Sequence, residues 1–185
     1  MRIIAGTHRG TALAAVGKGD AAAHLRPTSD RVRESLFNVL GGGRYGDPVR
    51  DARVLDLCAG TGALGLEALS RGASHVTFVD SGRAALGLIR ANIKKLRRES
   101  DCTVINTDVT RLPEAPAPCG LIFLDPPYCK GIGTKALAAA SVAGWIAPDA
   151  LIVWEESTAQ VAPPGFQAHD QRRYGDTWIT LMSAV

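Results

Sequence analysis

The chain has 185 residues, of which 46% are hydrophobic and 21% are charged, and its 20 Gly and 10 Pro are spread along its length. This composition excludes wholesale disorder. The length indicates one globular domain with at most a small appendage. The net charge of +3 is uneven, because residues 1–33 hold six Lys or Arg against two acids and the rest of the chain is slightly acidic. No apolar run reaches the roughly 20 residues that a bilayer span needs, and no secretory signal is visible, so we expect a cytoplasmic protein without a membrane association.

The first 45 residues predict an N-terminal extension and helix in front of one domain at 46–185. Residues 1–26 have the pattern of a short strand or hairpin followed by a loop rich in Gly and Ala. Ser29 or Asp30 can cap a helix that runs to about Leu40, and the three glycines at 41–43 end it.

From residue 53 onward, short apolar or β-branched runs alternate with longer helical segments, which is typical of an α/β fold with a mostly parallel sheet. Strands are predicted at 53–57, 75–80, 103–107, 120–125 and 150–155, and helices near 63–71, 82–98 and 133–145. The tail differs, because a Gly-Asp turn separates two strand-like runs at 171–174 and 177–182. We therefore expect a doubly wound, Rossmann-like sheet that ends in an antiparallel hairpin.

A glycine-rich loop follows the first predicted strand. Gly60, Gly62 and Gly65 satisfy the pattern G-x-G-x-x-G. A loop of this kind between a strand and a helix lets a ligand approach the backbone at the helix N-terminus. It predicts a site for an adenosine-containing cofactor, and the alternative is a tight strand-to-helix turn with no ligand.

Four aspartates stand near the ends of predicted strands: Asp56, Asp80, Asp108 and Asp125. Asp80 comes about 20 residues after the loop, where an acid can accept hydrogen bonds from ribose hydroxyls. Because the carboxyl ends of parallel strands meet at one edge of the sheet, four carboxylates there favour a positively charged cofactor over a pyrophosphate. Taken singly, each aspartate can instead serve as a helix cap or turn residue.

The most specific motif is Asp125-Pro126-Pro127-Tyr128, directly after the apolar run at 121–124. The two prolines end the strand and fix a rigid backbone without amide donors, so the Asp125 carboxylate and nearby carbonyls face a cleft beside an aromatic ring. This arrangement suits a planar base that carries an exocyclic amine, with Tyr128 stacking on the base. The carboxylate would stabilise the positive charge that develops on the nitrogen.

The glycine loop and the Asp-Pro-Pro-Tyr motif together resemble the S-adenosylmethionine-dependent amino-methyltransferases of nucleic acids. Four further segments, 1–10, 26–38, 62–73 and 174–177, resemble the RsmD family, whose members methylate the N2 amine of one guanine in 16S ribosomal RNA. The resemblance implies a class I methyltransferase sheet and S-adenosylmethionine as the cofactor. It also implies that the chain acts as a monomer on 16S rRNA or a small-subunit assembly particle, and it implies no metal.

The resemblance also implies a role for each matching residue. The base would be received by Asp125, Pro126, Pro127 and Tyr128. The cofactor would be bound by Asp56, Ala59, Gly60, Thr61, Gly62, Ala63, Asp80, Ser81, Asp108, Val109, Thr28 and Asn38, with residues 26–38 closing over it. The RNA would be bound by Arg2, His8, Arg9, Arg26, Arg31 and Arg33.

Three other functions are compatible with parts of the sequence. The amine-binding motif does not by itself distinguish guanine from adenine, so a DNA adenine-N6 methyltransferase is an alternative within the same chemistry. A nicotinamide-dependent dehydrogenase would use the glycine loop, but the Asp-Pro-Pro-Tyr motif and the C-terminal hairpin argue against it. A non-catalytic RNA-binding module with this fold is the third alternative.

The four cysteines do not predict a metal or redox site. Cys58, Cys102, Cys119 and Cys129 form no C-x-x-C pair, which leaves reduced thiols as the expected state. Cys129, next to Tyr128, could suggest covalent C5 methylation of a pyrimidine, but an amine target needs no nucleophile.

Overall fold

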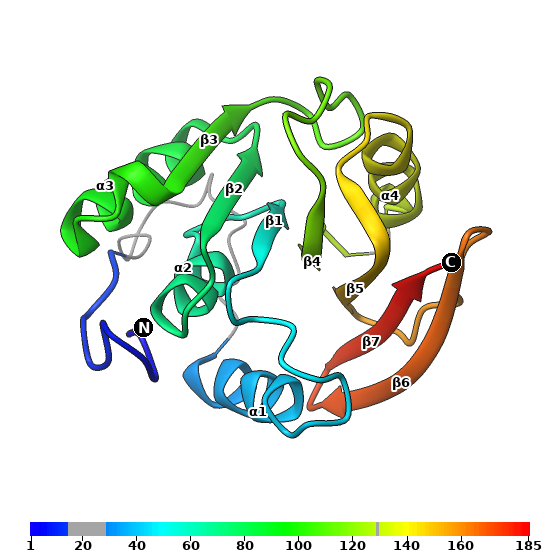
Figure 1. The fold of residues 1–185 in the computed structure, drawn as a ribbon, viewed down its shortest axis with the longest axis horizontal. Helices are drawn as coiled ribbons and strands as arrows, with labels where there is room; N and C mark the ends of the chain where they lie inside the picture. The colour runs from blue at the N-terminus through cyan, green and yellow to red at the C-terminus, as the bar shows by residue number, and fades with distance from the viewer. Residues whose placement is uncertain (15–28, 129) are drawn as a thin grey trace.

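In the computed structural model, residues 1–14, 29–128 and 130–185 are described, and they contain one seven-stranded sheet of order β3-β2-β1-β4-β5-β7-β6 (Figure 1). The strands are β1 (Arg53–Leu57), β2 (His75–Asp80), β3 (Cys102–Asn106), β4 (Cys119–Leu124), β5 (Ile146–Glu156), β6 (Phe166–Tyr174) and β7 (Thr177–Ala184). The strands β1 to β5 are parallel, whereas β7 is antiparallel to both of its neighbours, β5 and β6. The predicted mostly parallel sheet with an antiparallel C-terminal hairpin is therefore confirmed.

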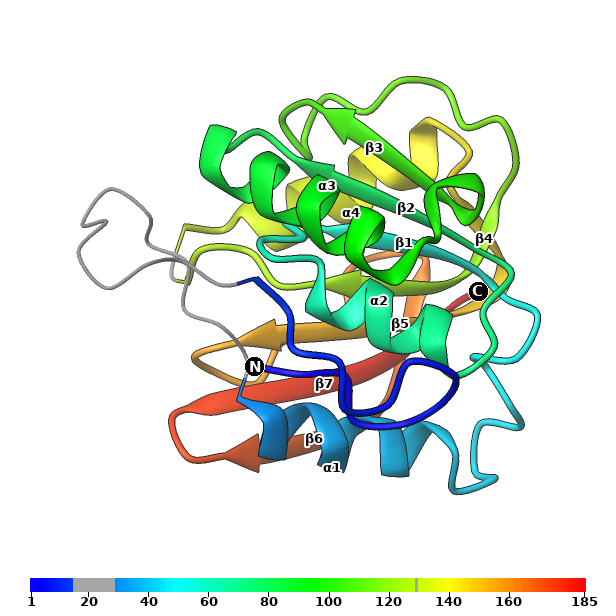
Figure 2. The same cartoon turned by 90° about the vertical axis from the view of Figure 1, so that its left-hand side faces the viewer.

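The helices cover the two faces of this sheet unequally. Figures 1 and 2 show α1 (Asp30–Leu40), α2 (Ala63–Ser70) and α3 (Arg83–Leu96) on one face and α4 (Ile132–Val142) on the other. Side chains of neighbouring strand positions are buried against opposite layers, for example Phe123 with the first three helices and Leu124 with α4. Because both faces are covered, the central strands are apolar at nearly every position. Among the helices of the described ranges, none has the length and apolarity to cross a membrane.

The predicted boundaries deviate most at the ends of the sheet. The strand β5 begins four residues earlier than predicted, and β6 reaches back to Phe166. As an edge strand, β6 is paired only with β7 and buries little of its length, so its sequence, Phe-Gln-Ala-His-Asp-Gln-Arg-Arg-Tyr, lacks a clear apolar alternation. The helix α3 ends at Leu96, because Arg97 adopts a left-handed conformation with φ of 53°.

The described part of the N-terminal extension packs on the domain. Ile3 and Leu13 are buried in the same apolar cluster as the strands and α2. The amides of Thr7 and His8 donate to the backbone oxygen and the hydroxyl of Ser70, at 2.8 and 2.9 Å. At Gly6, where φ is +80°, a Cβ atom would stand 1.8 Å from the carbonyl oxygen of Ser70, so this close approach requires glycine. The division at residue 45 stays a prediction.

Candidate functional site

The glycine-rich loop connects β1 to α2 through three residues in the left-handed region. Cys58, Gly60 and Gly62 have φ values of 59°, 58° and 76°. The Ala59 amide donates to Val79 of β2, and the Gly62 amide donates back to Ala59 at 2.7 Å, which closes a tight turn. Gly62 is the N-cap of α2 and has no side chain that could cap the helix, and the amide of Gly65 in the first turn donates to Asp56 instead.

Asp80 holds the loop and the start of α3 together. One carboxylate oxygen accepts the Gly60 amide at 2.9 Å, and the other accepts the Gly82 amide at 2.8 Å. An ionised carboxylate offers about four acceptor positions, so Asp80 retains the capacity to bind a ribose diol. Its place at the end of β2, beside the loop, agrees with the predicted role.

Asp56 does not lie on the open edge with Asp80. Its side chain is 2% exposed, and Oδ2 accepts the Gly65 amide at 2.9 Å. Burial raises the pKa of this carboxyl to about 8, against the opposing hydrogen bond from Gly65 and with a smaller contribution from the charge of Asp80. This corrects the predicted direct contact of Asp56 with a cofactor, because the carboxyl supports the loop backbone from below.

We expect Asp56→Asn to increase stability at alkaline pH. Because the folded-state pKa lies above the ordinary 3.8, folding favours the protonated carboxyl. The contribution of this carboxyl to stability is lost as the pH rises from 3.8 to about 8. An asparagine oxygen can still accept the Gly65 amide but has no proton to lose. The free energy of unfolding of the variant, relative to the parent protein, should grow by up to about 1.4 kcal/mol per pH unit over this window. Chemical denaturation at several pH values measures this, and a constant difference contradicts it.

Four carboxylates surround the end of β1. Burial raises the pKa of the Cys58 thiol, and the charges of Asp80, Asp125, Asp56 and Asp108 each raise it further. Asp108 itself is exposed, and its carboxylate accepts the amide and the hydroxyl of Thr110, both at 2.8 Å. Of these four, the carboxylates of Asp80 and Asp108 favour a cationic ligand, and the acceptors of Asp80 fit a cation that carries a ribose.

The Asp-Pro-Pro-Tyr segment lies against the same loop. The Asp125 amide donates to the Leu57 carbonyl at 3.3 Å, since β1 and β4 are neighbouring parallel strands. Burial raises the pKa of the Asp125 carboxyl well above 3.8, followed by the charges of Glu155, Asp56 and Glu156. The Tyr128 residue is half-buried, so it is partly packed in the protein and partly accessible to solvent. The two predicted motifs therefore share one edge of the sheet.

The remaining predicted cofactor residues differ in position. Thr61 and Ala63 are buried at the start of α2, Val109 is buried beside Asp108, and Ser81 is exposed after Asp80. Thr28 lies outside the described residues, as do Arg26 and Cys129.

Asn38 is misplaced for a cofactor contact. It is exposed in the last turn of α1, next to Phe37, which packs under Arg71 at the far end of α2 from the glycine loop. In Figure 2, the first turn of α1 lies near the N-terminus, on the side where β3 and β5 end. The helix runs from there towards the opposite side, so its last turn is far from these strand ends. This corrects the prediction for Asn38, whereas closure of residues 26–38 over the cofactor stays a prediction.

Asn92 is a loop-supporting residue that the sequence analysis did not identify. Its buried amide on α3 donates to the Thr61 carbonyl at 3.0 Å and to the Ala14 carbonyl at 3.2 Å, and its oxygen accepts the Ala14 amide at 2.7 Å. One side chain thus joins the glycine loop to the N-terminal extension. The polar residue on the apolar face of α3, one position before Ile93, was the available signal.

Arg33 was predicted to bind RNA, and this is wrong. The side chain is 0% exposed, and it is paired with Asp30 at 2.9 Å and with Glu67 at 3.7 Å, while it also donates to the Arg2 carbonyl. A guanidinium held inside the protein by two carboxylates cannot reach a phosphate. The spacing to Phe37 and Leu40, four and seven residues on, was the sequence signal for the buried face of α1.

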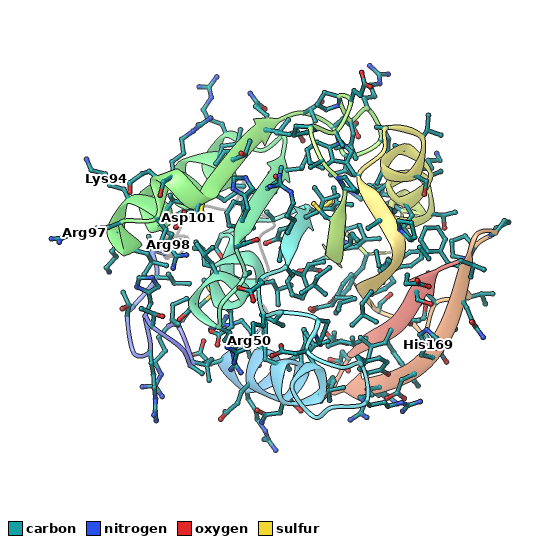
Figure 3. All side chains as sticks on the ribbon, in the orientation of Figure 1. Arg50, Lys94, Arg97, Arg98, Asp101 and His169 are labelled. Atoms are coloured by element: carbon teal, nitrogen blue, oxygen red, sulfur yellow. The ribbon has the colours of Figure 1, made fainter. Side chains whose placement is uncertain are left out.

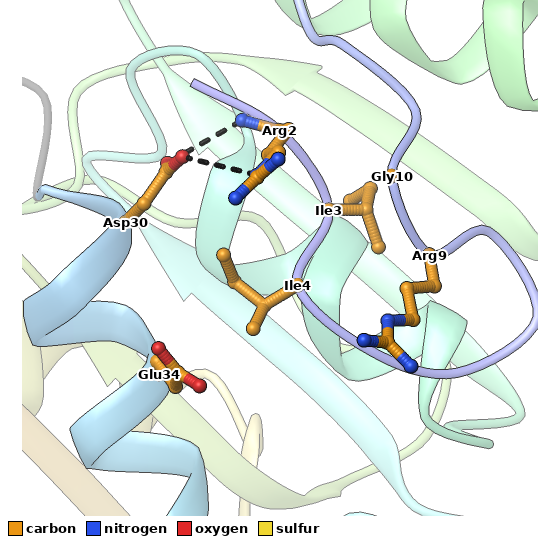
Figure 4. A pocket seen from close by; sticks show the side chains of 7 residues that line it. All are labelled: Arg2, Ile3, Ile4, Arg9, Gly10, Asp30 and Glu34. Atoms are coloured by element: carbon orange, nitrogen blue, oxygen red, sulfur yellow. Dashed lines mark hydrogen bonds and ion pairs between the residues drawn. The ribbon is translucent and has the colours of Figure 1, made fainter.

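The other predicted RNA residues that the structure describes, Arg2, His8, Arg9 and Arg31, are at least partly accessible. Arg2 and Arg9 line a small pocket between the N-terminal extension and α1, together with Ile3, Ile4, Gly10, Asp30 and Glu34 (Figure 4). Arg2 is turned towards Asp30, at 3.9 Å, whereas Arg9 and Arg31 are exposed. His8 lies 3.4 Å from Nη1 of Arg98, and burial and this neighbour lower the pKa of the imidazole. His8 is therefore kept mostly neutral at neutral pH.

A cationic surface connects the N-terminal extension with the end of α3. Figure 3 shows Lys94, Arg97 and Arg98 on one side of the molecule, and the His8 contact places the extension beside them. Two segments that are far apart in sequence thus contribute to one positively charged region, which suits a polyanionic partner.

Comparisons with known proteins agree with this geometry. Residues 1–183 match the family model described as "Conserved hypothetical protein 95". The chain is 34% identical over 184 residues to ribosomal RNA small subunit methyltransferase D of Escherichia coli (strain K12), covering 98% of this chain and 88% of that protein. It is 35% identical over 159 residues to the Haemophilus influenzae protein of the same name, with coverages of 84% and 78%.

Solved structures show the same fold. The yhhF protein of Escherichia coli, a proposed methyltransferase, superposes with a TM-score of 0.82 and 34% identity over 100% of this chain and 97% of that one. A Thermus thermophilus 16S rRNA N2 G1207 methyltransferase, solved with AdoMet and guanosine, gives a TM-score of 0.64 at 18% identity, covering 87% of this chain and 44% of the other. At this identity the second similarity shows the fold alone.

Proposed function

Because this chain belongs to the RsmD family of ribosomal RNA methyltransferases, we propose that it methylates the exocyclic N2 amine of a guanine in 16S rRNA. Bound S-adenosylmethionine supplies an electrophilic methyl group on a sulfonium and leaves as S-adenosylhomocysteine. The observation that carries the proposal is the junction of β1 and β4, where the Asp125 amide donates to Leu57 directly before the glycine loop. The glycine loop and the amine-binding motif therefore lie side by side at one edge of the sheet.

The residues of the rim fit this cofactor. We assign the methionine portion to Gly60 and Gly62 in the loop before α2, the ribose to the remaining acceptors of Asp80, and the adenine to the neighbourhood of Asp108. The carboxylates of Asp80 and Asp108 favour a sulfonium electrostatically. Asn92 and Asp56 hold the loop in shape without touching the ligand themselves.

Asp125 is the residue that assists the chemistry. The amine is a poor nucleophile, because its lone pair is delocalised into the ring, and an N–H bond donated to the carboxylate favours the pyramidal form that can attack. As the nitrogen–carbon bond forms, the carboxylate stabilises the positive charge on nitrogen. Its raised pKa then makes it a better acceptor for the surplus proton than an ordinary aspartate. Tyr128 holds the base by stacking.

The target guanine has to leave its base stack in order to reach Asp125, which favours RNA in a loop or a partly assembled particle over a regular duplex. The exposed cations of the N-terminal extension and of the end of α3 would hold the flanking phosphates. We propose that the protein works in this way as a monomer in the cytoplasm.

The function is tested with labelled S-adenosylmethionine and three substrates: protein-free 16S rRNA, small-subunit particles from cells that lack this protein, and genomic DNA. We expect label in ribosomal RNA only, at one guanine N2. Label in DNA alone would establish the adenine alternative. RNA binding without any label would favour a non-catalytic module, and tight NADH binding without S-adenosylhomocysteine binding would favour a dehydrogenase.

The RNA surface is tested by Arg9→Glu. Arg9 is exposed on the N-terminal extension, and we expect the reversal of its charge to raise the KM for RNA about fivefold or more. The slope of the logarithm of RNA affinity against the logarithm of salt concentration should become shallower by about one. The affinity for S-adenosylhomocysteine should not change. Lys135→Glu is the matched control, because this exposed residue lies on α4 across the sheet. Equal effects of both variants on the KM would remove the assignment.

A further inference from the structure

The hydroxyl of Tyr128 is anchored by two other elements. It donates to Glu155 Oε1 at 3.1 Å, near the end of β5, and it lies 3.1 Å from Thr177 Oγ1, at the start of β7. A phenol has one proton, so the Thr177 hydroxyl donates to the phenol oxygen while the carboxylate receives the phenol proton. The half-buried ring is therefore fixed at its tip from both sides.

Glu155 also faces Asp125. In the parallel pairing of β4 with β5, Leu124 stands opposite Trp154, so the next residues, Asp125 and Glu155, are neighbours whose side chains leave the same face. Glu155 is almost fully buried, and of the charged neighbours its carboxylate raises the Asp125 pKa the most. Glu155 thus accepts the hydrogen bond of the Tyr128 hydroxyl and raises the pKa of the Asp125 carboxyl.

The C-terminal hairpin supplies the other contact through its tip. Tyr174 pairs with Thr177 across the turn, where Gly175 has φ of 63° and its carbonyl accepts Nε of Arg173 at 2.9 Å. On the other side, Ser35 of α1 lies 3.2 Å from the Tyr174 hydroxyl. The tip is thereby held between α1 and the Asp-Pro-Pro-Tyr segment, a position that the antiparallel turn alone does not explain.

We propose that Glu155 and Thr177 are positioning residues of the methyl-transfer site, which hold the Tyr128 ring by its hydroxyl in the orientation that stacks on the target base. This inference rests on the proposed role of Tyr128 in binding the base. It gives the turn at 174–177 a function, because the turn delivers Thr177 to the site. Glu155 has the additional effect of keeping Asp125 ready to accept a proton.

The hydrogen-bond part is tested with Thr177→Val and Thr177→Ser. Valine fills the same volume without a hydroxyl, so kcat/KM for RNA should fall about five- to tenfold, the effect of one lost hydrogen bond, whereas serine should restore it. The affinity for S-adenosylhomocysteine should stay unchanged in both. Thr103→Val is the control, because its hydroxyl bonds His75 on the opposite side of the sheet, 2.9 Å away.

Tyr128→Phe completes the test and covers the case that Thr177→Val is poorly folded. It keeps the ring and removes the anchored hydroxyl, so it should resemble Thr177→Val, and the double variant should be no worse than Tyr128→Phe alone. Additive losses, or full activity of either folded single variant, overturn the anchoring role.

The charge part is tested with Glu155→Gln. Glutamine keeps an acceptor for Tyr128 but removes a negative charge beside Asp125, while Asp56, Glu156, Cys58 and Tyr128 remain around that carboxyl. The acidic limb of the kcat profile should move to lower pH, because ionised Asp125 is then less strongly disfavoured. An unmoved limb overturns this role of Glu155. The unmodified protein is assayed in parallel, and if it labels no RNA, the proposed function fails and this inference fails with it.

Discussion

Asp125→Ala should lose methyl transfer almost completely, with kcat reduced about 10²- to 10³-fold or more, as when a group that stabilises transition-state charge is removed. The variant lacks both the acceptor for the amine N–H and the negative charge beside the developing cation. Its affinity for S-adenosylhomocysteine should remain close to that of the parent, because Asp80 and the glycine loop are intact. Single-turnover methyl incorporation and calorimetric titration measure the two quantities.

Loss of the fold can be distinguished from loss of chemistry in this variant. The Asp125 pKa is raised in the folded protein, so the ionised carboxyl disfavours folding at neutral and alkaline pH, and its removal should leave the protein at least as stable there. Glu114→Gln, an exposed substitution in the loop before β4, is the control for a change of charge. Turnover of Asp125→Ala at the parent rate would refute the role of the carboxylate.

Glu67→Ala should cost about 3–5 kcal/mol of the free energy of unfolding, because it removes one partner of a buried ion pair. Glu67 on α2 and Arg33 on α1 are both 0% exposed. The carboxylate accepts the amides of Ile4 and Ala5, at 2.8 and 3.0 Å, and Nε of Arg71 at 2.7 Å. In Arg33, Nε and Nη1 already have no hydrogen-bond partner among the described residues. Among those residues, the variant leaves this cation paired with the Asp30 carboxylate alone.

The same change should release the N-terminal extension. The amides of Ile4 and Ala5 should exchange with solvent much faster, and the KM for RNA should rise, because Arg2 and Arg9 would lose their fixed positions. Denaturant titration and hydrogen exchange measure these effects, with Glu114→Ala as an exposed control. A loss of stability below about 1 kcal/mol, the range typical of surface pairs, would show that the Glu67 network contributes little.

Short-range patterns predicted the edge of the sheet that carries the glycine loop and the Asp-Pro-Pro-Tyr motif. The predicted strands 53–57 and 75–80 have the same first and last residues as β1 and β2, because both are apolar runs between clear turn signals. Both strands are covered on two faces. The glycine loop and Asp-Pro-Pro-Tyr each occupy a few consecutive residues whose local conformation is restricted by Gly and Pro. Parallel strands then bring the ends of β1 and β4 together, so two local motifs were sufficient to predict that both lie at one edge of the sheet.

The sequence by itself determined the α/β fold, the cofactor loop and the amine-binding motif, because each depends on backbone preferences and apolar spacing within a short segment. Only the tertiary structure decided which polar side chains face the interior. It buried Arg33 between Asp30 and Glu67, placed Asp56 beneath the loop, and joined Tyr128 to Glu155 and Thr177. These contacts join residues from different elements that are far apart in the sequence. The residue type of an arginine or a glutamate does not show whether its side chain meets solvent or a buried charge, because this depends on how the elements pack together.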